Sequence, residues 1–239
     1  MYTKTDVSVI IPVYNETVRL ISGLEKVLLY LTHQRYTWEL IIVDDGSTPP
    51  IHVKKFPVSV YRLPKNMGKG RAIAYGVEKA RGKAIVFTDV DLSVSPETIT
   101  PLLAKLKRYP VVIGSRRKKG ATIVVHQAVI RESAGRLFTL LSNVICAVGV
   151  LDVTCGLKGF TREAAKSLFS LQRIHRWVFD TEIVFLARKK GMSVYEMPVS
   201  WVNKSGSKVR PWDSVASLVD LFRIRWNDIL GRYNTDRDK

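Results

Sequence analysis

The stretch VSVIIPVYNE, residues 7–16, decides the fold of this chain. Residues 7–13 form an almost unbroken apolar, β-branched run, which is the pattern of a strand buried in a parallel sheet. Pro12 and Asn15 end the run, and the polar side chains of Tyr14, Asn15 and Glu16 follow it. We therefore expect a buried strand that carries polar groups at its carboxyl end.

Further segments of the same kind alternate along the first half of the chain. Strands are predicted at 39–43, 58–63, 84–88 and 111–114, and helices at 16–31, at 66–80 and from Pro96 onward. Strands that alternate with helices of roughly 10–16 residues indicate βαβ units. The prediction is an α/β fold with a mostly parallel, doubly wound sheet flanked by helices.

The second half is less regular. Helices are predicted at 128–148, from Arg162 and at 180–190, a strand at 193–199, and a mobile polar loop at 203–210. A basic amphipathic helix is predicted at 212–230. Its apolar face holds Trp212, Val215, Leu218, Val219, Phe222, Trp226 and Ile229.

Composition restricts the kind of protein and of partner. The 239 residues include 38 Lys and Arg against 21 Asp and Glu, a net charge of +17, and 46% are hydrophobic. Such a chain is globular, and its charge favours nucleic acid, an anionic membrane face or phosphorylated substrates, among which composition does not choose. Two cysteines indicate a reducing compartment. We expect no signal peptide, and the longest apolar stretch, 137–151, falls short of the roughly 20 residues of a spanning helix.

Polar clusters stand at the expected ends of four strands: residues 14–16, 44–45, 89–91 and 115–117. In open α/β sheets, ligands bind beyond the carboxyl ends of the strands. The coincidence predicts that the four clusters share one site.

For two of these clusters and for one loop, the sequence allows both a functional and a structural interpretation. Asp89 and Asp91 form an Asp-x-Asp pair that suits Mg²⁺ or Mn²⁺ bridging two phosphates, or else a turn that caps the next helix. Asp45 accepts hydrogen bonds from a ribose or base, or forms a turn. In the loop 66–70, the glycines admit a phosphate or allow tight helix packing, and no P-loop pattern is present.

Together the motifs resemble those of the family 2 inverting glycosyltransferases of GT-A fold, in particular the polyprenyl-phosphate hexose synthases. The matching motifs are VSVIIPVYNE (7–16), IIVDDGS (41–47), NMGKGRA (66–72), FTDVDLS (87–93) and IGSRR (113–117). The resemblance implies a Rossmann-like GT-A domain and a metal-dependent hexosyltransferase.

The second half resembles dolichyl-phosphate glucose synthases more than mannose synthases. This rests on DVTCGLKGFTREAA (152–165), RWVFDTEIVFLARKKG (176–191) and VSWVNKSGSKV (199–209). The resemblance implies inverting transfer of a hexose from a nucleotide diphosphate sugar, UDP-glucose rather than GDP-mannose, to dolichyl or another polyprenyl phosphate. GDP-mannose, and a hydroxyl acceptor on a polysaccharide or protein, remain as alternatives.

The resemblance also implies which residues bind the donor. By resemblance, Asp89 and Asp91 hold the metal; Lys208 is a candidate to close over the diphosphate because it lies in the polar loop at 203–210. The other donor-binding residues are Pro12, Tyr14, Glu16, Val43, Asp45, Lys69 and Val90.

A phosphate acceptor needs no general base, because it is largely dianionic at neutral pH. Cationic side chains must instead hold the donor diphosphate and the acceptor phosphate close together. Arg116 and Arg117, after the strand at 111–114, and Arg131, on the next helix, are the candidates for this clamp, and the alternative is solvated surface charge. The resemblance matches Arg116, Arg131 and Ser133 to this role, and we expect Asp91, Arg116 and Arg131 to be the catalytic residues. A hydroxyl acceptor would require a base such as Asp180 or Glu182.

Residues 1–210 are assigned to the catalytic domain, with a donor half at 1–117 and an acceptor half at 118–210. Residues 211–239 form the basic amphipathic helix and tail. We expect a peripheral protein on the cytosolic face of an anionic membrane, helped by a membrane-protein partner or by homo-oligomerisation. No nucleic-acid motif supports the competing prediction of nucleic-acid binding.

Overall fold

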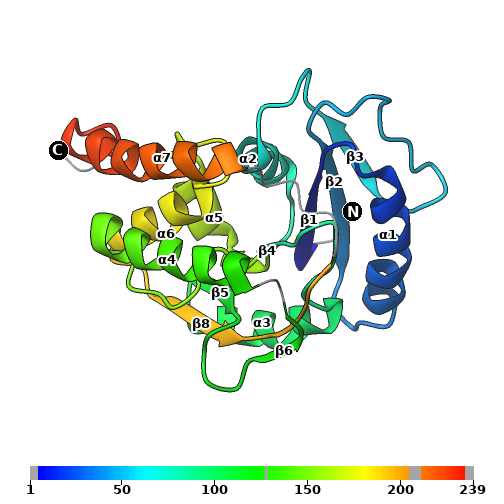
Figure 1. Cartoon of the computed structure of the whole chain (residues 1–239). Coiled ribbons are helices and arrows are strands. Elements are labelled where there is room, and N and C mark those ends of the chain that lie inside the picture. The colour runs from blue at the N-terminus through cyan, green and yellow to red at the C-terminus, as the bar shows by residue number, and fades with distance from the viewer. Residues whose placement is uncertain (1–4, 127–128, 205–210, 235–239) are drawn as a thin grey trace.

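A mixed α/β fold is built around one large twisted sheet (Figure 1). The computed structural model describes residues 5–126, 129–204 and 211–234. The strand order in the main sheet is β3-β2-β1-β4-β7-β5-β8. The strands are β1 Val7–Val13, β2 Trp38–Asp44, β3 Ser59–Arg62, β4 Ala84–Phe87, β5 Val111–Ser115, β7 Lys158–Thr161 and β8 Val194–Pro198.

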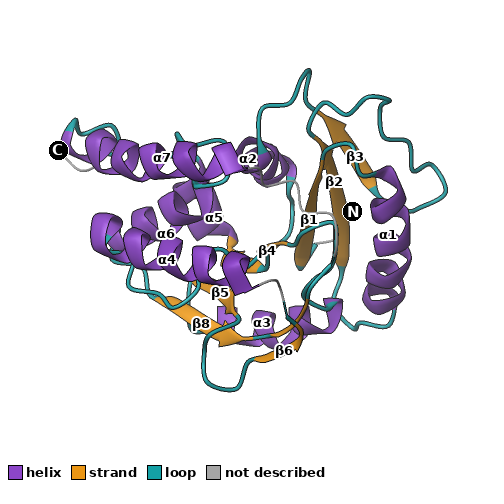
Figure 2. Cartoon of the chain, in the orientation of Figure 1, coloured by secondary structure: helices purple, strands orange, loops and turns teal. Residues whose placement is uncertain are grey.

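Helices cover both faces of this sheet (Figure 2). They are α1 Thr17–Thr32, α2 Lys69–Lys79, α3 Ile99–Leu106, α4 Val129–Cys146, α5 Arg162–Phe169, α6 Phe179–Lys189 and α7 Pro211–Ile229, with a short 3-10 helix Pro96–Thr98 before α3. These bounds agree with the predicted segments to within a few residues.

Alternate residues of β1 enter two separate cores, because successive strand side chains point to opposite faces. Ile10 packs with residues of α2, α5 and α6 in one core. Val9 and Ile11 pack with residues of α1 and α3 in the other. Burial on both faces explains why the strand reads as a continuous apolar run.

Two features were not predicted. β7 lies antiparallel between β4 and β5, so the sheet is mostly but not wholly parallel. A second, two-stranded sheet pairs β6 Thr122–Val125 with β9 Ser200–Val202. No strand is predicted from the sequence where β7 lies, because its residues Lys-Gly-Phe-Thr include a lysine and a glycine and so form no apolar run.

α4 and α7 pack against each other, and both expose apolar side chains. α7 buries Leu221 and Ile224 completely, while Phe222 and Trp226 are 63% and 59% exposed. On α4, Ile130 is 86% exposed. Within the described ranges, none of the helices has the length and apolar character needed to cross a bilayer.

Candidate active site

The loops that follow β1 and β2 are tied together at the carboxyl edge of the sheet. The Asn15 amide donates to Ser47 Oγ at 2.9 Å, and the Thr48 amide donates to Asn15 Oδ1 at 2.8 Å.

Pro12 and Val43 are register partners on β1 and β2, and both are buried. Beside them, the Tyr14 side chain is 39% exposed. Glu16 forms an ion pair with Arg19 at 3.0 Å. The residues predicted to line a nucleoside pocket therefore gather at one edge of the sheet.

Asp45 organises the glycine-containing loop before α2. Its carboxylate accepts hydrogen bonds from the amides of Met67, at 2.7 Å, and Gly68, at 2.9 Å. Burial raises the pKa of Asp45, and these two amides oppose the shift. Because both amides are committed to Asp45, they do not form a phosphate cradle.

The glycines of this loop are explained by packing. Gly68 has φ +99°, and a Cβ there would lie 2.5 Å from the His175 carbonyl oxygen. A Cβ on Gly70 would lie 2.6 Å from Cβ of Phe179. Of the two readings of residues 66–70, the close helix packing is the one these contacts support.

Asp89 and Asp91 lie on the turn that follows β4. The Ser93 amide donates to Asp91 Oδ1 at 2.9 Å, and Asp89 Oδ1 forms an ion pair with Lys69 Nζ at 2.6 Å. Gly156 backs the turn, since a Cβ there would lie 2.0 Å from Asp89 Oδ2. Val90 lies between the two carboxylates on this turn.

The carboxylates of Asp89 and Asp91 suit a hard divalent cation. Mg²⁺ is commonly held by one or two carboxylates together with substrate phosphates rather than by an all-protein cage. In keeping with this, the described residues contain no group of three or more His, Cys, Asp or Glu side chains able to hold a metal. The Asp89–Asp91 turn fits an ion shared with a diphosphate.

Lys69, the first residue of α2, lies among negative charges. Burial opposes its charge, but the carboxylates of Asp89, Asp180 and Asp91 outweigh burial and raise the Lys69 pKa. The Lys69 ammonium also lies 5.7 Å above the Phe179 ring. It is therefore a fixed cation beside the proposed metal ligands.

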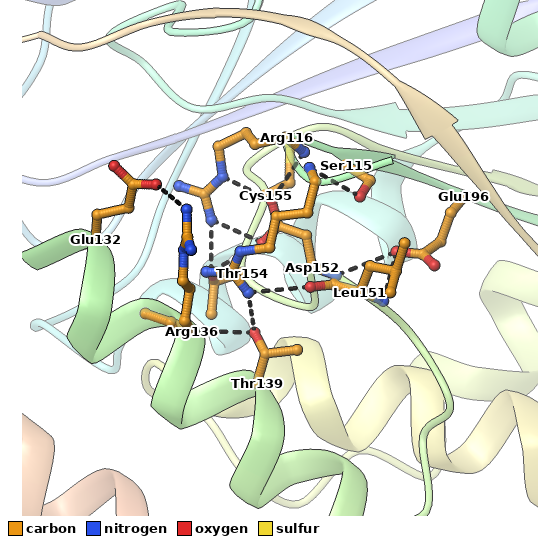
Figure 3. Close-up of polar contacts among 12 residues, drawn as sticks. Ser115, Arg116, Glu132, Arg136, Thr139, Leu151, Asp152, Thr154, Cys155 and Glu196 are labelled. Carbon is orange, nitrogen blue, oxygen red and sulfur yellow. Dashed lines mark hydrogen bonds and ion pairs between the residues drawn. The ribbon is translucent and has the colours of Figure 1, made fainter. Parts of the chain in front are cut away.

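Arg116 follows β5 and is held by a fork of hydrogen bonds (Figure 3). Its Nε and one terminal nitrogen donate to the two oxygens of Asp152 at 2.6 and 2.7 Å, and that nitrogen also donates to Thr154 Oγ1 at 2.7 Å. The guanidinium lies 5.5 Å from the centre of the Trp201 ring. Burial would raise the pKa of Asp152, but Arg116 outweighs it and lowers that pKa.

The neighbouring Arg117 braces the loop against α4. Its guanidinium donates to Thr139 Oγ1 at 2.9 Å and to the Leu151 carbonyl at 3.0 Å. Arg131 and Ser133, predicted to share the acceptor clamp, are both exposed near the start of α4. Lys208, the predicted lid residue, lies outside the described residues.

Asp180 and Glu182 are buried in the first turn of α6. Glu182 accepts hydrogen bonds from Tyr233 Oη at 2.6 Å and from the amides of Arg173 and Ile174 at 2.8 to 3.1 Å. Asp180 forms an ion pair with Lys158 at 2.6 Å. Both carboxylates are buried and already have partners inside the fold, so neither is placed to act as a base for a hydroxyl acceptor.

Sequence reasoning missed four residues that build the site: Asp152, Thr154, Lys158 and Trp201. Asp152, Thr154 and Lys158 lie in the motif 152–165, whose sequence indicates the family but no role for these side chains. The neighbouring sequence does not reveal the Lys158–Asp180 and Arg116–Asp152 pairs, because their members lie 22 and 36 residues apart in the chain.

Comparison with known proteins agrees with this geometry. The family described as "Glycosyl transferase family 2" matches residues 8–169. A dolichyl-phosphate beta-glucosyltransferase of Trichomonas vaginalis is 35% identical over 91% of this chain and 72% of its own length. The human dolichyl-phosphate beta-glucosyltransferase is 31% identical over 97% of this chain and 78% of its own length.

Solved structures share the fold. Glucosyl-3-phosphoglycerate synthase of Mycobacterium tuberculosis, in complex with Mn²⁺, UDP-glucose and phosphoglyceric acid, has a TM-score of 0.65 at 19% identity. The match covers 96% of this chain and 80% of that one. Mannosyl-3-phosphoglycerate synthase of Rubrobacter xylanophilus has a TM-score of 0.62 at 14% identity, over 98% of this chain and 77% of that one. With its GT-A fold and its matching motifs, this chain belongs to glycosyl transferase family 2 and is a glycosyltransferase.

Proposed function

We propose that this enzyme transfers glucose from UDP-glucose to the phosphate of dolichyl phosphate, with inversion. The observation that carries the proposal is the placement of two opposite charge sets around one edge of the sheet. The carboxylates Asp89 and Asp91 follow β4, and the cation Arg116 follows β5. The relatives named above, at 31 and 35% identity, support glucose and dolichyl phosphate as the substrates.

The donor half of the site holds a diphosphate and a divalent cation. Asp89 and Asp91 would ligate Mg²⁺ or Mn²⁺, which offsets the charge that grows on the departing UDP. Lys69 adds a fixed positive charge at the same carboxylates. Pro12, Tyr14 and Asp45 lie where the nucleoside would bind, beyond β1 and β2.

The acceptor half holds a phosphate monoester. Arg116 is pre-oriented by Asp152 and Thr154, so little side-chain entropy is lost when it binds an anion. Arg117, Arg131 and Ser133 complete the proposed clamp. An acceptor oxygen attacks the sugar carbon opposite the leaving group, the bond to UDP breaks with its electron pair on UDP, and no proton has to move.

The buried carboxylates favour this acceptor over a hydroxyl group. An alcohol would need a nearby base, whereas a phosphate with a second pKa of about 6 does not. In the first turn of α6, Asp180 is paired with Lys158 and Glu182 accepts hydrogen bonds from Tyr233 and two amides. Both are thus occupied by structural contacts.

The test is incubation with labelled UDP-glucose or GDP-mannose, Mn²⁺ and dolichyl phosphate, followed by organic extraction. Glucose is expected in the lipid fraction, and Asp91→Ala is expected to abolish it. Label from GDP-mannose alone would overturn the proposed donor. Transfer to an alcohol acceptor that is lost in Asp180→Asn would overturn the proposed acceptor.

We further propose that α4 and α7 bring the enzyme to an anionic membrane as a peripheral protein. Apolar side chains are exposed on both helices and on Leu230, just after α7, although the helices pack together, and the chain carries a charge of +17. The exposed set is Val129, Ile130, Leu137, Leu140, Val144, Val215, Leu218, Val219, Phe222, Trp226, Ile229 and Leu230.

Vesicle co-sedimentation tests this surface. Phe222→Asp/Trp226→Asp is expected to lose binding to vesicles that contain anionic lipid. Val18→Asp is the control, because Val18 is 85% exposed on α1, at the opposite end of the molecule from α7 (Figure 1). Unchanged binding of the double variant would refute the membrane role, and a shift from dimer to monomer would assign the surface to self-association.

A further inference from the structure

A lysine with no solvent exposure lies beneath the proposed metal ligands. Lys158, the first residue of β7, is the register partner of Phe87, two residues before Asp89. Its ammonium donates to the Cys155 carbonyl at 2.7 Å and forms an ion pair with Asp180 at 2.6 Å. A buried charge is costly unless it is paired and hydrogen-bonded, so this arrangement needs a reason.

The Lys69 ammonium lies 5.7 Å from the ring centre of Phe179, the residue next to Asp180 on α6. Burial raises the pKa of Asp180, and the charges of Lys158 and Lys69 oppose that shift. Lys69 in turn forms the 2.6 Å ion pair with Asp89. The four side chains make a row of alternating charge, Lys158, Asp180, Lys69 and Asp89. The row begins at Lys158, whose side chain is fully buried, and ends at Asp89, whose side chain is 36% exposed.

We propose that Lys158 is a positioning residue of the donor site, acting through Asp180 on Lys69. Lys158 holds the Asp180 side chain in place through their 2.6 Å ion pair, and Asp180 retains the Lys69 ammonium at the site when a divalent cation takes over Asp89. Lys69 is then free to face the donor diphosphate without leaving the pocket. The inference rests on the proposed function, because it assumes a nucleotide diphosphate donor.

The competing explanation is that the Lys158–Asp180 pair only stabilises the fold. The two explanations separate because a buried ion pair is often replaced by uncharged residues at little cost, whereas removal of one partner is damaging. Lys158→Met/Asp180→Asn removes both charges together. Lys158→Arg, which keeps the positive charge opposite Asp180, is the second variant and serves if the double variant does not fold; its longer side chain must move the Asp180 carboxylate.

The measurement is calorimetric binding of UDP in the presence of Mn²⁺, on full-length protein, with thermal unfolding recorded beside it. Both variants are expected to bind UDP about tenfold more weakly, which corresponds to about 1.4 kcal/mol. The matched control is Lys189→Met/Asp228→Asn, which removes a 2.6 Å pair between α6 and α7, and its affinity should be unchanged.

A double-mutant cycle tests the route through Lys69. In a Lys69→Met background, Lys158→Met/Asp180→Asn should cause no further loss of affinity, because the residue that it positions is gone. A folded Lys158→Met/Asp180→Asn protein with wild-type affinity would overturn the inference while leaving the proposed function intact. Wild-type protein that does not bind UDP would refute the proposed donor and the inference together.

Discussion

Replacing Gly156 by alanine should disable the enzyme without unfolding it. Gly156 lies just before β7, and a Cβ there would lie 2.0 Å from Asp89 Oδ2 and 2.5 Å from Asp89 Cγ. Its backbone φ is one that L side chains adopt, so alanine itself is not strained. The clash falls on the end of a flexible side chain, and the carboxylate must therefore move.

The size of the movement follows from the contact distance. Ordinary contact begins at 3.4 Å, so the Asp89 oxygen must shift by the difference from 2.0 Å, about 1.4 Å. A misplacement of about 1 Å in a catalytic site can cost on the order of 100-fold in rate. We expect glucose transfer to dolichyl phosphate to fall about 100-fold, with a melting temperature within a few degrees of wild type.

The assay is lipid extraction after incubation with labelled UDP-glucose, with calorimetric binding of Mn²⁺ and UDP on the same samples. Gly135→Ala is the control, since a Cβ there makes only an ordinary 3.4 Å contact with Arg117. A folded Gly156→Ala enzyme within threefold of wild-type activity would refute the reasoning. It would mean that Asp89 is not held against Gly156, or is not needed.

Three further outcomes are expected. Arg116→Lys cannot reproduce the two hydrogen bonds of the arginine to Asp152, so transfer to lipid phosphate should fall at least about tenfold. Mn²⁺-dependent binding of UDP, measured by calorimetry, should be unchanged. Weaker UDP binding would argue against a role on the acceptor side alone. Burial raises the pKa of Glu182 from 4.5 to about 7, so its contribution to stability is present below pH 4.5 and is lost as the pH rises to 7. Relative to Glu182→Gln, the free energy of unfolding of the wild type should fall by about 3 kcal/mol over that range in urea titrations, and a constant difference would contradict the shift. Removal of divalent ions by EDTA should abolish transfer, and Mn²⁺ should restore it; activity that survives EDTA would contradict a metal on Asp89 and Asp91.

Much of the fold was accessible from local pattern. The buried strand 7–13 was recognisable because both of its faces are covered and its side chains are apolar without alternation. The carboxyl edge followed from the rule that ligands bind where parallel strands end. That rule predicts that Asp45, Asp89 and Arg116 lie at the same edge of the sheet.

β7 and β6 were missed for a physical reason. β7 has a lysine and a glycine among its four residues, and it is formed by pairing with β4 and β5 across the sheet. β6 is formed by pairing with β9, nearly 80 residues further along the chain. The stability of such a strand comes from its neighbours rather than from its own propensities. Lys158 was missed with β7, since a lysine in sequence is read as solvated until its burial is seen.

By itself, the sequence determined the helices, most strands of the main sheet, the family, and which residue types stand at the carboxyl edge of the sheet. These follow from periodicity and from motifs of adjacent residues. Only the tertiary structure decided what each charged group does. It assigned the amides of the 66–68 loop to Asp45, the Arg116 fork to Asp152, and Asp180 to the buried Lys158. Such pairings join distant segments, and their strength depends on burial, which no local stretch of sequence encodes.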